Sequence, residues 1–310
     1  MSAWAIIGDG PWGDALARRL AAAGHTVALV GDKADRRKRP AGITHGTDAR
    51  AALAEAERVI LAVSPDTLDA RLRAIAPALQ GNHRLATVTP GLTPEGARPG
   101  EAVVAATAVR QVAVIAGAAS PEAVRKGQPA ALVVGSAFTT WAEEIQAALA
   151  SDTLRVYTEK DHAGVELANA LAAVLGVALG AARALGVGAA TEATALTRAI
   201  AEMDRLVTGL GGNAGTAYGL AGLGVLTELV FAADGDAFDA GARLAAGEVD
   251  AARSAHPDLA GLAERLGARA RRHRLRAPLV DTVAALFAGR LPAGDALAGL
   301  MARSVRAERG

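Results

Sequence analysis

The sequence contains no cysteine and few aromatic residues, and these shortages exclude several classes of protein. Without cysteine the chain has no disulfide, no thiolate nucleophile and no cysteine-based metal site. Aromatic residues make up 3% of the 310 residues, and the formal net charge is +1 at pH 7. A nearly neutral chain has no overall electrostatic attraction to nucleic acid or to an anionic membrane surface. We therefore expect neither as a partner.

A targeting segment and a long uninterrupted hydrophobic run are also missing. The first apolar run, residues 4–7, begins without the basic region, apolar stretch and cleavage site of a secretory signal. The longest uncharged stretch, residues 207–227, is interrupted by many glycines, which argues against a membrane span. These features predict a cytoplasmic protein. The hydrophobic fraction of 51% is ample for a core, and the length suits two domains.

Hydrophobic periodicity divides the chain into two regions. Up to about residue 157, short apolar runs alternate with helical patterns, which predicts an α/β fold with a mostly parallel sheet covered on both faces. Beyond residue 158 the strand signal disappears. We expect a Rossmann-type domain at 1–155 and an all-helical domain at 156–310. The predicted strands are 4–7, 26–30, 59–63, 85–88, 112–116, 130–134 and 154–157. The predicted helices of the second domain are 162–185, 191–206, 220–231, 259–273, 278–288 and 293–306.

Glycines in a G-x-G-x-x-G pattern follow the first predicted strand and open a helical segment. Gly8 permits a sharp turn, Gly10 lets the backbone approach a pyrophosphate, and Gly13 lets the helix pack against the strand. The helix N-terminus offers unpaired N–H groups to the phosphates. Together with Pro11 and Trp12, these glycines predict a dinucleotide-binding turn.

Asp32 lies roughly twenty residues after this turn, where an acidic side chain holds the ribose 2′-OH of NAD and repels the 2′-phosphate of NADP. The basic segment 36–39 follows and offers a partner for that phosphate. We expect NAD as the cofactor, with NADP as the alternative. A simple turn residue after Gly31 explains Asp32 almost as well.

Five separated stretches match, in order, the motifs of one enzyme family. They are GDGPWG at 8–13, AG and VRKGQPA within 116–130, VY and GVEL within 156–167, LTRAIAEM at 196–203, and YGLAGLG at 218–224. On these motifs most of the chain resembles the NAD(P)-dependent glycerol-3-phosphate dehydrogenase family. The resemblance implies a Rossmann-type domain, an all-helical domain and a substrate pocket between them. It also implies a homodimer, which is common in the family.

The sequence departs from the family at the positions that handle the substrate. The resemblance places the catalytic lysine at Ala172 and a second lysine at Pro90. The aspartate that closes the family's G-L-A-G-L-G-D motif is Val225. The S-R-N group that holds the substrate phosphate falls on residues 235–237, so Asp236 replaces an arginine.

These replacements remove chemistry that the family reaction needs. Hydride loss from an alcohol requires a group that accepts the hydroxyl proton, and such a group is worth about 10²–10⁴ in rate. The alanine at 172 cannot do this. The exchange of arginine for Asp236 loses a charge-assisted hydrogen bond, about 1.5–3 kcal/mol, and adds repulsion. We therefore favour a non-catalytic, nucleotide-binding or regulatory role. The lysines of the chain are Lys33, Lys38, Lys126 and Lys160.

Two alternatives stay open. In the first, the chain is an active NAD(P)-dependent dehydrogenase that acts on a CH–OH group of a non-phosphorylated substrate. In the second, it is a glycerol-3-phosphate dehydrogenase that reduces dihydroxyacetone phosphate through replacement residues that the sequence does not reveal. Asn169 shares a helical face with Ala172, but its amide does not titrate. Tyr218 is a proton-donor candidate. Neither is assigned as catalytic.

Other ionisable residues have simpler explanations. Glu166 and Glu202 match residues of the family motifs, and we interpret them as structural. The acidic run within 234–239 lacks the glycine and the distal glutamate of a calcium loop. We interpret it as a solvated loop and expect no metal site. The basic residues of 269–276 are interpreted as a solvated helix end.

Overall fold

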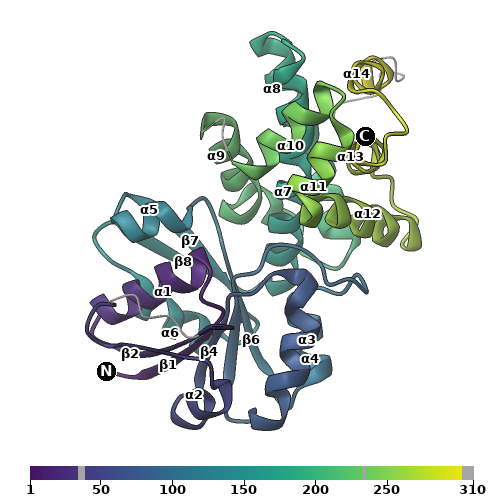
Figure 1. Ribbon diagram of the computed structural model, residues 1–310. Coiled ribbons are helices and arrows are strands. Elements are labelled where there is room, and N and C mark those ends of the chain that lie inside the picture. The colour runs from purple at the N-terminus through teal and green to yellow at the C-terminus, as the bar shows by residue number, and fades with distance from the viewer. Residues whose placement is uncertain (34–38, 233–234, 302–310) are drawn as a thin grey trace.

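The described chain forms an eight-stranded sheet with its covering helices, in the lower half of Figure 1, and a second group of helices, in the upper half. The computed structural model describes residues 1–33, 39–232 and 235–301. All structural statements concern these residues. The segment 36–38, which includes three of the predicted phosphate partners, lies outside them.

The sheet has the order β3-β2-β1-β4-β5-β6-β7-β8. The first six strands follow the doubly wound Rossmann order, so the predicted fold class is confirmed. Only β6 and β7 pair antiparallel among the described strands, with Ile115 opposite Val134. The strands are β1 (Ala3–Ile7), β2 (Thr26–Val30), β3 (Ile43–Gly46), β4 (Arg58–Leu61), β5 (Arg84–Thr87), β6 (Gln111–Ala116), β7 (Ala130–Gly135) and β8 (Leu154–Glu159).

Strand β3 is the one described strand that the sequence did not predict. Its residues, Ile43–Gly46, alternate between partly buried and exposed side chains, and the strand lies at the edge of the sheet. An edge strand of four residues has no continuous apolar run for a sequence pattern to detect. Pairing with the buried strand β2 holds it in place, beginning with Val27 opposite Ile43.

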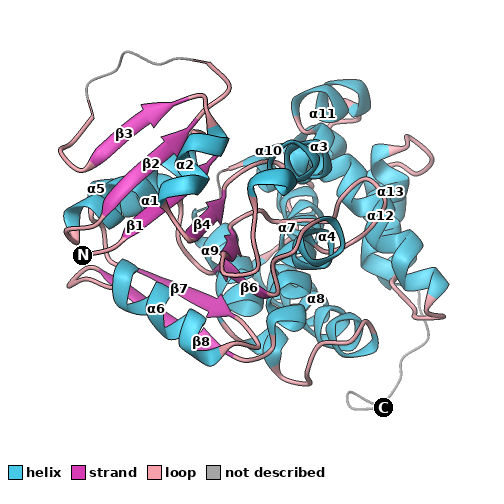
Figure 2. Ribbon diagram, turned by 90° about the horizontal axis from the view of Figure 1, so that it is seen from below, coloured by secondary structure: helices cyan, strands magenta, loops and turns pink. Residues whose placement is uncertain are grey.

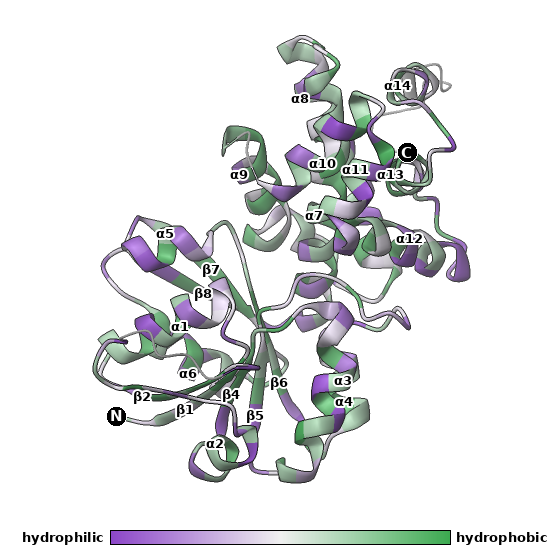
Figure 3. Ribbon diagram, in the orientation of Figure 1, coloured by the Kyte–Doolittle hydropathy of each residue, from purple (hydrophilic) through white to green (hydrophobic). Residues whose placement is uncertain are grey.

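Helices cover both faces of the sheet, as Figure 2 shows from below. Apolar side chains of α1 and α6 pack on one face, and those of α2, α3 and α4 pack on the other. The central strands are mainly green in Figure 3, whereas the outer helix α12 has several purple turns. The helices of this half are α1 (Pro11–Ala22), α2 (Ala49–Glu55), α3 (Pro65–Ile75), α4 (Pro99–Ala106), α5 (Pro121–Lys126) and α6 (Thr139–Leu149), with a 3₁₀ turn at Ala76–Ala78.

The second half is helical and is built around α7. This helix is long and apolar enough to cross a membrane, but 83% of its most apolar window is buried inside the protein. The burial among other helices confirms the predicted core position. The helices are α7 (His162–Ala184), α8 (Ala189–Gly209), α9 (Val225–Ala232), α10 (Asp236–Ala245), α11 (Val249–Ala255), α12 (Pro257–Arg272), α13 (Pro278–Phe287) and α14 (Ala293–Met301). A 3₁₀ turn at Thr216–Tyr218 and a π-helical turn at Leu220–Gly224 precede α9.

The acidic run forms the first turn of a helix, so its interpretation as a solvated loop is wrong for Asp236 and Asp239. Asp234 lies outside the described residues. Acidic side chains stabilise a helix N-terminus through the helix dipole. Helix α10 then packs directly on α7, where a Cβ on Gly241 would lie 2.4 Å from the carbonyl oxygen of Val177. A short helix with four alanines, two aspartates and one glycine has few large apolar residues to reveal it in the sequence, and the close contact explains the glycine at 241.

Strand β8 ends at Glu159, and α7 begins at His162. The sheet and the helical half therefore follow one another in the chain. The division into domains at residue 155 stays a prediction.

Candidate functional site

The Gly-rich turn joins β1 to α1, and each of its glycines meets a different constraint. Gly8 has φ +110°, and a Cβ there would lie 2.2 Å from the carbonyl oxygen of Ala62. A Cβ on Gly13 would lie 1.9 Å from the carbonyl oxygen of Gly8. At Gly10 an added Cβ would meet nothing within 4 Å, so that side of the turn is open. These constraints fit a turn that a pyrophosphate approaches closely.

The first turn of α1 leaves N–H groups without partners. Gly10 is the N-cap and has no side chain to bond them, and Pro11 at the first helical position has no N–H. The N–H groups of Trp12 and Gly13 therefore point to the open end of the helix. Trp12 is partly buried against the core between α1 and the sheet. The role of these residues in binding stays a prediction.

Two carboxylates flank the turn, and both are paired. Asp9 Oδ2 lies 3.1 Å from Nε2 of His45 on the edge strand β3. Asp14 accepts hydrogen bonds from Arg18 at 2.7 Å and from Arg39 at 2.6 Å. Burial works to raise the pKa of Asp14, but the two guanidinium groups outweigh it and lower the pKa overall. Arg39 therefore forms an ion pair with a residue of α1.

Asp32 follows the end of β2 and forms an ion pair with Arg71 on α3. The side chain of Asp32 is 75% exposed, whereas that of Arg71 is 27% exposed. Sequence reasoning missed Arg71, because an arginine within an amphipathic helix looks like an ordinary solvated residue. Its meeting with Asp32 depends on the order of the strands.

Ala172, the position that the resemblance gives to the catalytic lysine, is buried. Ala172 is fully buried in an apolar cluster that contains Leu92 after β5, Val114 on β6 and Leu262 on α12. Residues from both halves of the chain therefore take part in the same core. Asn169, one turn earlier, is partly buried and its side chain makes no hydrogen bond to any described residue.

Tyr218 lies in the short turn Thr216–Tyr218 and is 54% exposed. Among the described residues, no hydrogen bond joins its side chain to Asn169. The structure therefore does not assemble the two catalytic candidates into one hydrogen-bonded group.

Two buried glutamates bind helix N-termini. Glu166 accepts hydrogen bonds from Gly100 N at 2.7 Å and Arg98 Nη1 at 2.9 Å, which ties α7 to the start of α4. Glu202 accepts from Leu279 N at 2.9 Å and Val280 N at 3.0 Å, and so caps α13. Burial raises the pKa of Glu202, although the two N–H groups act against it. These contacts support the structural interpretation of both residues.

Arginines of α12 hold the helical half against the sheet. Arg269 donates to Gly96 O at 2.8 Å and pairs with Glu101 at 3.2 Å, while Arg265 pairs with Asp66 at 3.1 Å. Burial works to raise the pKa of Glu101, but Arg269 and the neighbouring Arg98 lower it to about 2. Arg269 is only 15% exposed, so the solvated-helix-end interpretation is wrong for this residue.

Carboxylates gather where the resemblance places the phosphate-holding group. Burial raises the pKa of Asp258, and a hydrogen bond that its protonated carboxyl donates to Asp66 and the charge of Asp236 add to the effect. The side chain of Asp236 is 89% exposed. Asp239 accepts from His256 at 2.6 Å. The exposed side chain at the position that the resemblance gives to an arginine is therefore a carboxylate, and the nearby Arg243 and Arg265 are paired with Asp239 and Asp66.

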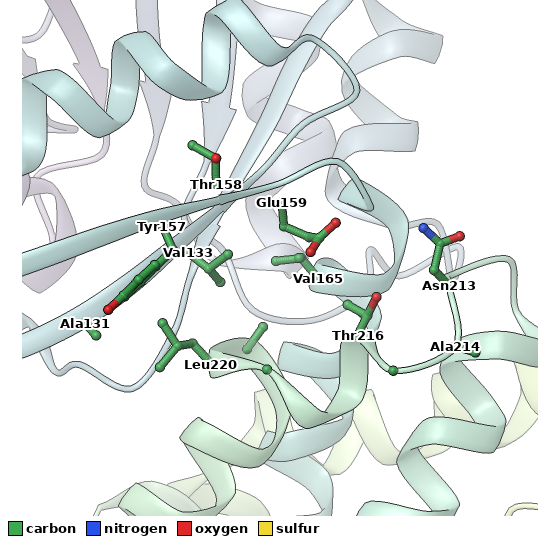
Figure 4. A pocket seen from close by; sticks show the side chains of 13 residues that line it. Ala131, Val133, Tyr157, Thr158, Glu159, Val165, Asn213, Ala214, Thr216 and Leu220 are labelled. Atoms are coloured by element: carbon green, nitrogen blue, oxygen red, sulfur yellow. The ribbon is translucent and has the colours of Figure 1, made fainter.

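A cavity of about 600 Å³ lies elsewhere, between β7, β8 and the segment 213–221 (Figure 4). Tyr157 and Leu220 face it, together with Glu159 and the turn that contains Thr216. None of the residues of the Gly-rich turn lines it. The cavity therefore does not belong to the predicted dinucleotide site.

The doubly wound sheet, the glycine turn and the helical second half are those of a dinucleotide-binding protein of the dehydrogenase type. Comparison with known proteins identifies the family. The model described as NAD-dependent glycerol-3-phosphate dehydrogenase N-terminus matches residues 31–142, and the C-terminus model matches 161–298. The chain belongs to the NAD-dependent glycerol-3-phosphate dehydrogenase family, and the predicted resemblance is confirmed. The NAD(P) cofactor of the family is confirmed with it.

Relatives match over nearly the whole chain. A protein of Gloeobacter violaceus named glycerol-3-phosphate dehydrogenase (NAD(P)+) is 34% identical, with 99% of each chain covered. The crystal structure of glycerol-3-phosphate dehydrogenase from Coxiella burnetii superposes with a TM-score of 0.87 at 26% identity, covering 97% of this chain and 99% of that one. The yeast enzyme GPD1 shares the fold with a TM-score of 0.83 at 14% identity, covering 97% and 99%.

Proposed function

We propose that this chain binds NAD(P) at the Gly-rich turn and Asp32 but does not oxidise glycerol 3-phosphate. We further propose that it has a nucleotide-binding or regulatory role. The observation that carries the proposal is Ala172, which is fully buried in an apolar cluster at the position that the resemblance gives to the catalytic lysine. A bound dinucleotide would supply the hydride chemistry, and the protein would have to supply the proton transfer.

No residue within one helical turn of Ala172 has an ionisable side chain that could take over that proton transfer. The sequence has no lysine after residue 160. His162, at the start of α7, has a buried Nε2 without a hydrogen-bond partner among the described residues. It precedes Ala172 by ten residues, which is about 15 Å along a helix at 1.5 Å per residue. Its nearest carboxylate is Glu166 at 3.7 Å, which already binds the N-terminus of α4.

The charge distribution supports the same proposal. The dianionic phosphate of glycerol 3-phosphate would approach Asp236 rather than an arginine. Asp66 and Asp258 share a hydrogen bond nearby, and Arg265 is already paired with Asp66. Repulsion between like charges weakens the binding of such a substrate.

The test combines an activity assay with a binding assay. Purified protein is incubated with dihydroxyacetone phosphate and NADH or NADPH, and the loss of reduced cofactor is followed by absorbance. The Gloeobacter violaceus relative serves as the positive control. We expect no turnover above background, together with measurable NAD(H) or NADP(H) binding by calorimetry. Turnover at the rate of the control would refute the proposal, and absence of binding would refute its first half.

A second candidate function is that of an oxidoreductase for a non-phosphorylated substrate. The side chain of Asn169 favours it, because a partly buried amide with no hydrogen bond to described residues can bind a substrate carbonyl. Oxidation of NADH or NADPH is measured with a panel of unphosphorylated ketones and aldehydes. Activity that disappears in Asn169→Leu would favour this function over the first.

Location and assembly complete the proposal. We propose a cytoplasmic protein, a homodimer, and domains at 1–155 and 156–310. Cell fractionation, light scattering and limited proteolysis test these three statements. Membrane association, a monomeric mass, or cleavage far from residue 155 would contradict them in turn.

A further inference from the structure

The ion pair of Asp32 and Arg71 joins two elements that are distant in sequence. Asp32 follows the carboxyl end of β2, and Arg71 lies on α3, the helix after β4. Strands β2 and β4 flank β1 in the sheet, and β1 leads into the Gly-rich turn. The pair therefore spans the carboxyl edge of the sheet beside the strand that enters the predicted pyrophosphate site. In open α/β sheets, ligands bind outside this edge.

The charges of this pair act on the two cofactors in different ways. A lone carboxylate at Asp32 would accept the ribose hydroxyls of NAD and repel the 2′-phosphate of NADP. The guanidinium of Arg71 neutralises that carboxylate. Its planar set of donors also matches the geometry of a phosphate, which accepts two parallel N–H bonds.

The exposure of the two side chains shows which one is held by the protein. Arg71 is 27% exposed, so much of its stem is packed, whereas Asp32 is 75% exposed. The carboxylate can turn away to solvent while the guanidinium stays at the site. A largely exposed ion pair is a weak interaction, and a phosphate dianion competes for the guanidinium.

We propose that Arg71 binds the 2′-phosphate of NADP, and that Asp32 weakens this binding because it forms an ion pair with the Arg71 guanidinium. The inference rests on the dinucleotide binding proposed above. It assigns the phosphate contact to a helix residue rather than to the basic segment that follows β2. The last residue of that segment, Arg39, is bound to Asp14 on α1 at 2.6 Å.

Calorimetric titration of the intact protein with NAD⁺ and NADP⁺ tests the inference without any enzyme assay. Asp32→Asn should free the guanidinium and strengthen NADP⁺ binding about tenfold, the value of one charge-assisted hydrogen bond. Arg71→Gln should weaken NADP⁺ about tenfold and leave NAD⁺ within a factor of about three. The double variant Asp32→Asn/Arg71→Gln should not show the stronger NADP⁺ binding that is expected of Asp32→Asn alone. Arg71→Lys should keep part of the NADP⁺ affinity.

The matched control is Arg73→Gln, which removes an exposed arginine from the same helix. It should change neither affinity, and thermal melting should show that every variant is folded. The inference is overturned if Arg71→Gln changes both affinities equally or changes neither. If the unmodified protein binds neither dinucleotide, the proposed function fails as well, so the two failures are distinguishable.

Discussion

Adding one methyl group to Gly13 or to Gly10 separates the folding role of the Gly-rich turn from its binding role. In Gly13→Ala the new Cβ would lie 1.9 Å from the carbonyl oxygen of Gly8 and 2.9 Å from its carbonyl carbon. Both atoms belong to the backbone, so α1 must move away from the turn. Overpacking of this kind costs about 1–3 kcal/mol, and a contact with rigid backbone belongs at the upper end.

Gly10→Ala is the matched variant. An added Cβ at Gly10 meets no atom within 4 Å, and the residue has φ −66°, which alanine adopts freely. The cost to folding is at most about 1 kcal/mol, because alanine is a poor N-cap. The methyl group occupies the open side of the turn, so dinucleotide affinity should fall although the protein stays folded.

Urea unfolding followed by far-UV circular dichroism measures the free energy of unfolding of both variants and of the parent protein. Calorimetry on the same samples measures the affinity for NAD⁺. We expect Gly13→Ala to be the less stable of the two by about 1–2 kcal/mol. Equal stabilities would refute the packing argument, and unchanged NAD⁺ affinity in Gly10→Ala would refute the predicted approach of the pyrophosphate.

Three further predictions concern packing and charge away from the turn. The pKa of Glu101 is lowered to about 2, so its ion pair with Arg269 stabilises the protein fully above the ordinary glutamate pKa. This contribution is lost as pH falls through about 4 towards 2, and Glu101→Gln should flatten that part of the stability profile measured by thermal melting. Glu202→Ala leaves two N–H groups of α13 without their acceptor, which should cost about 1–3 kcal/mol in urea unfolding. Gly241→Ala forces α10 away from α7 and should cost about 1–3 kcal/mol, whereas Gly294→Ala, in α14 and with nothing within 4 Å, should be neutral or slightly stabilising.

Each of these predictions has a contradicting outcome. The same acid dependence in Glu101→Gln and in the parent protein would show that another group is responsible. A stable Glu202→Ala would mean that water replaces the carboxylate at the α13 N-terminus. Equal effects of the two glycine substitutions would show that the contact between α7 and α10 is not tight.

Local patterns predicted the parts of the fold whose signals lie within one element. The seven predicted strands appeared as short apolar runs, and α7 appeared as a long apolar segment. Strand β3 was missed because its four residues, Ile-Thr-His-Gly, contain no run of apolar side chains. Helices α10 and α11 were missed because both are short and rich in alanine, so that the buried face of α10 contains only two large apolar residues, Phe238 and Leu244.

The candidate site also contains residues that the local sequence revealed and residues that it did not. The glycine turn was recognisable because the conformation of Gly8 and the close contact of Gly13 are requirements of a strand, a turn and a helix in immediate succession. Arg71 and Arg269 were not recognisable, because each acts on a partner brought close by the tertiary structure.

The sequence alone determined the fold class, the family, the glycine turn and the absence of any lysine beyond residue 160. Only the tertiary structure decided that Ala172 is buried in an apolar cluster to which both halves contribute and that Asp32 meets Arg71. The physical reason is distance along the chain. Backbone conformation and periodicity are properties of neighbouring residues, whereas burial and charge pairing depend on segments that meet only after the sheet and the helices have packed.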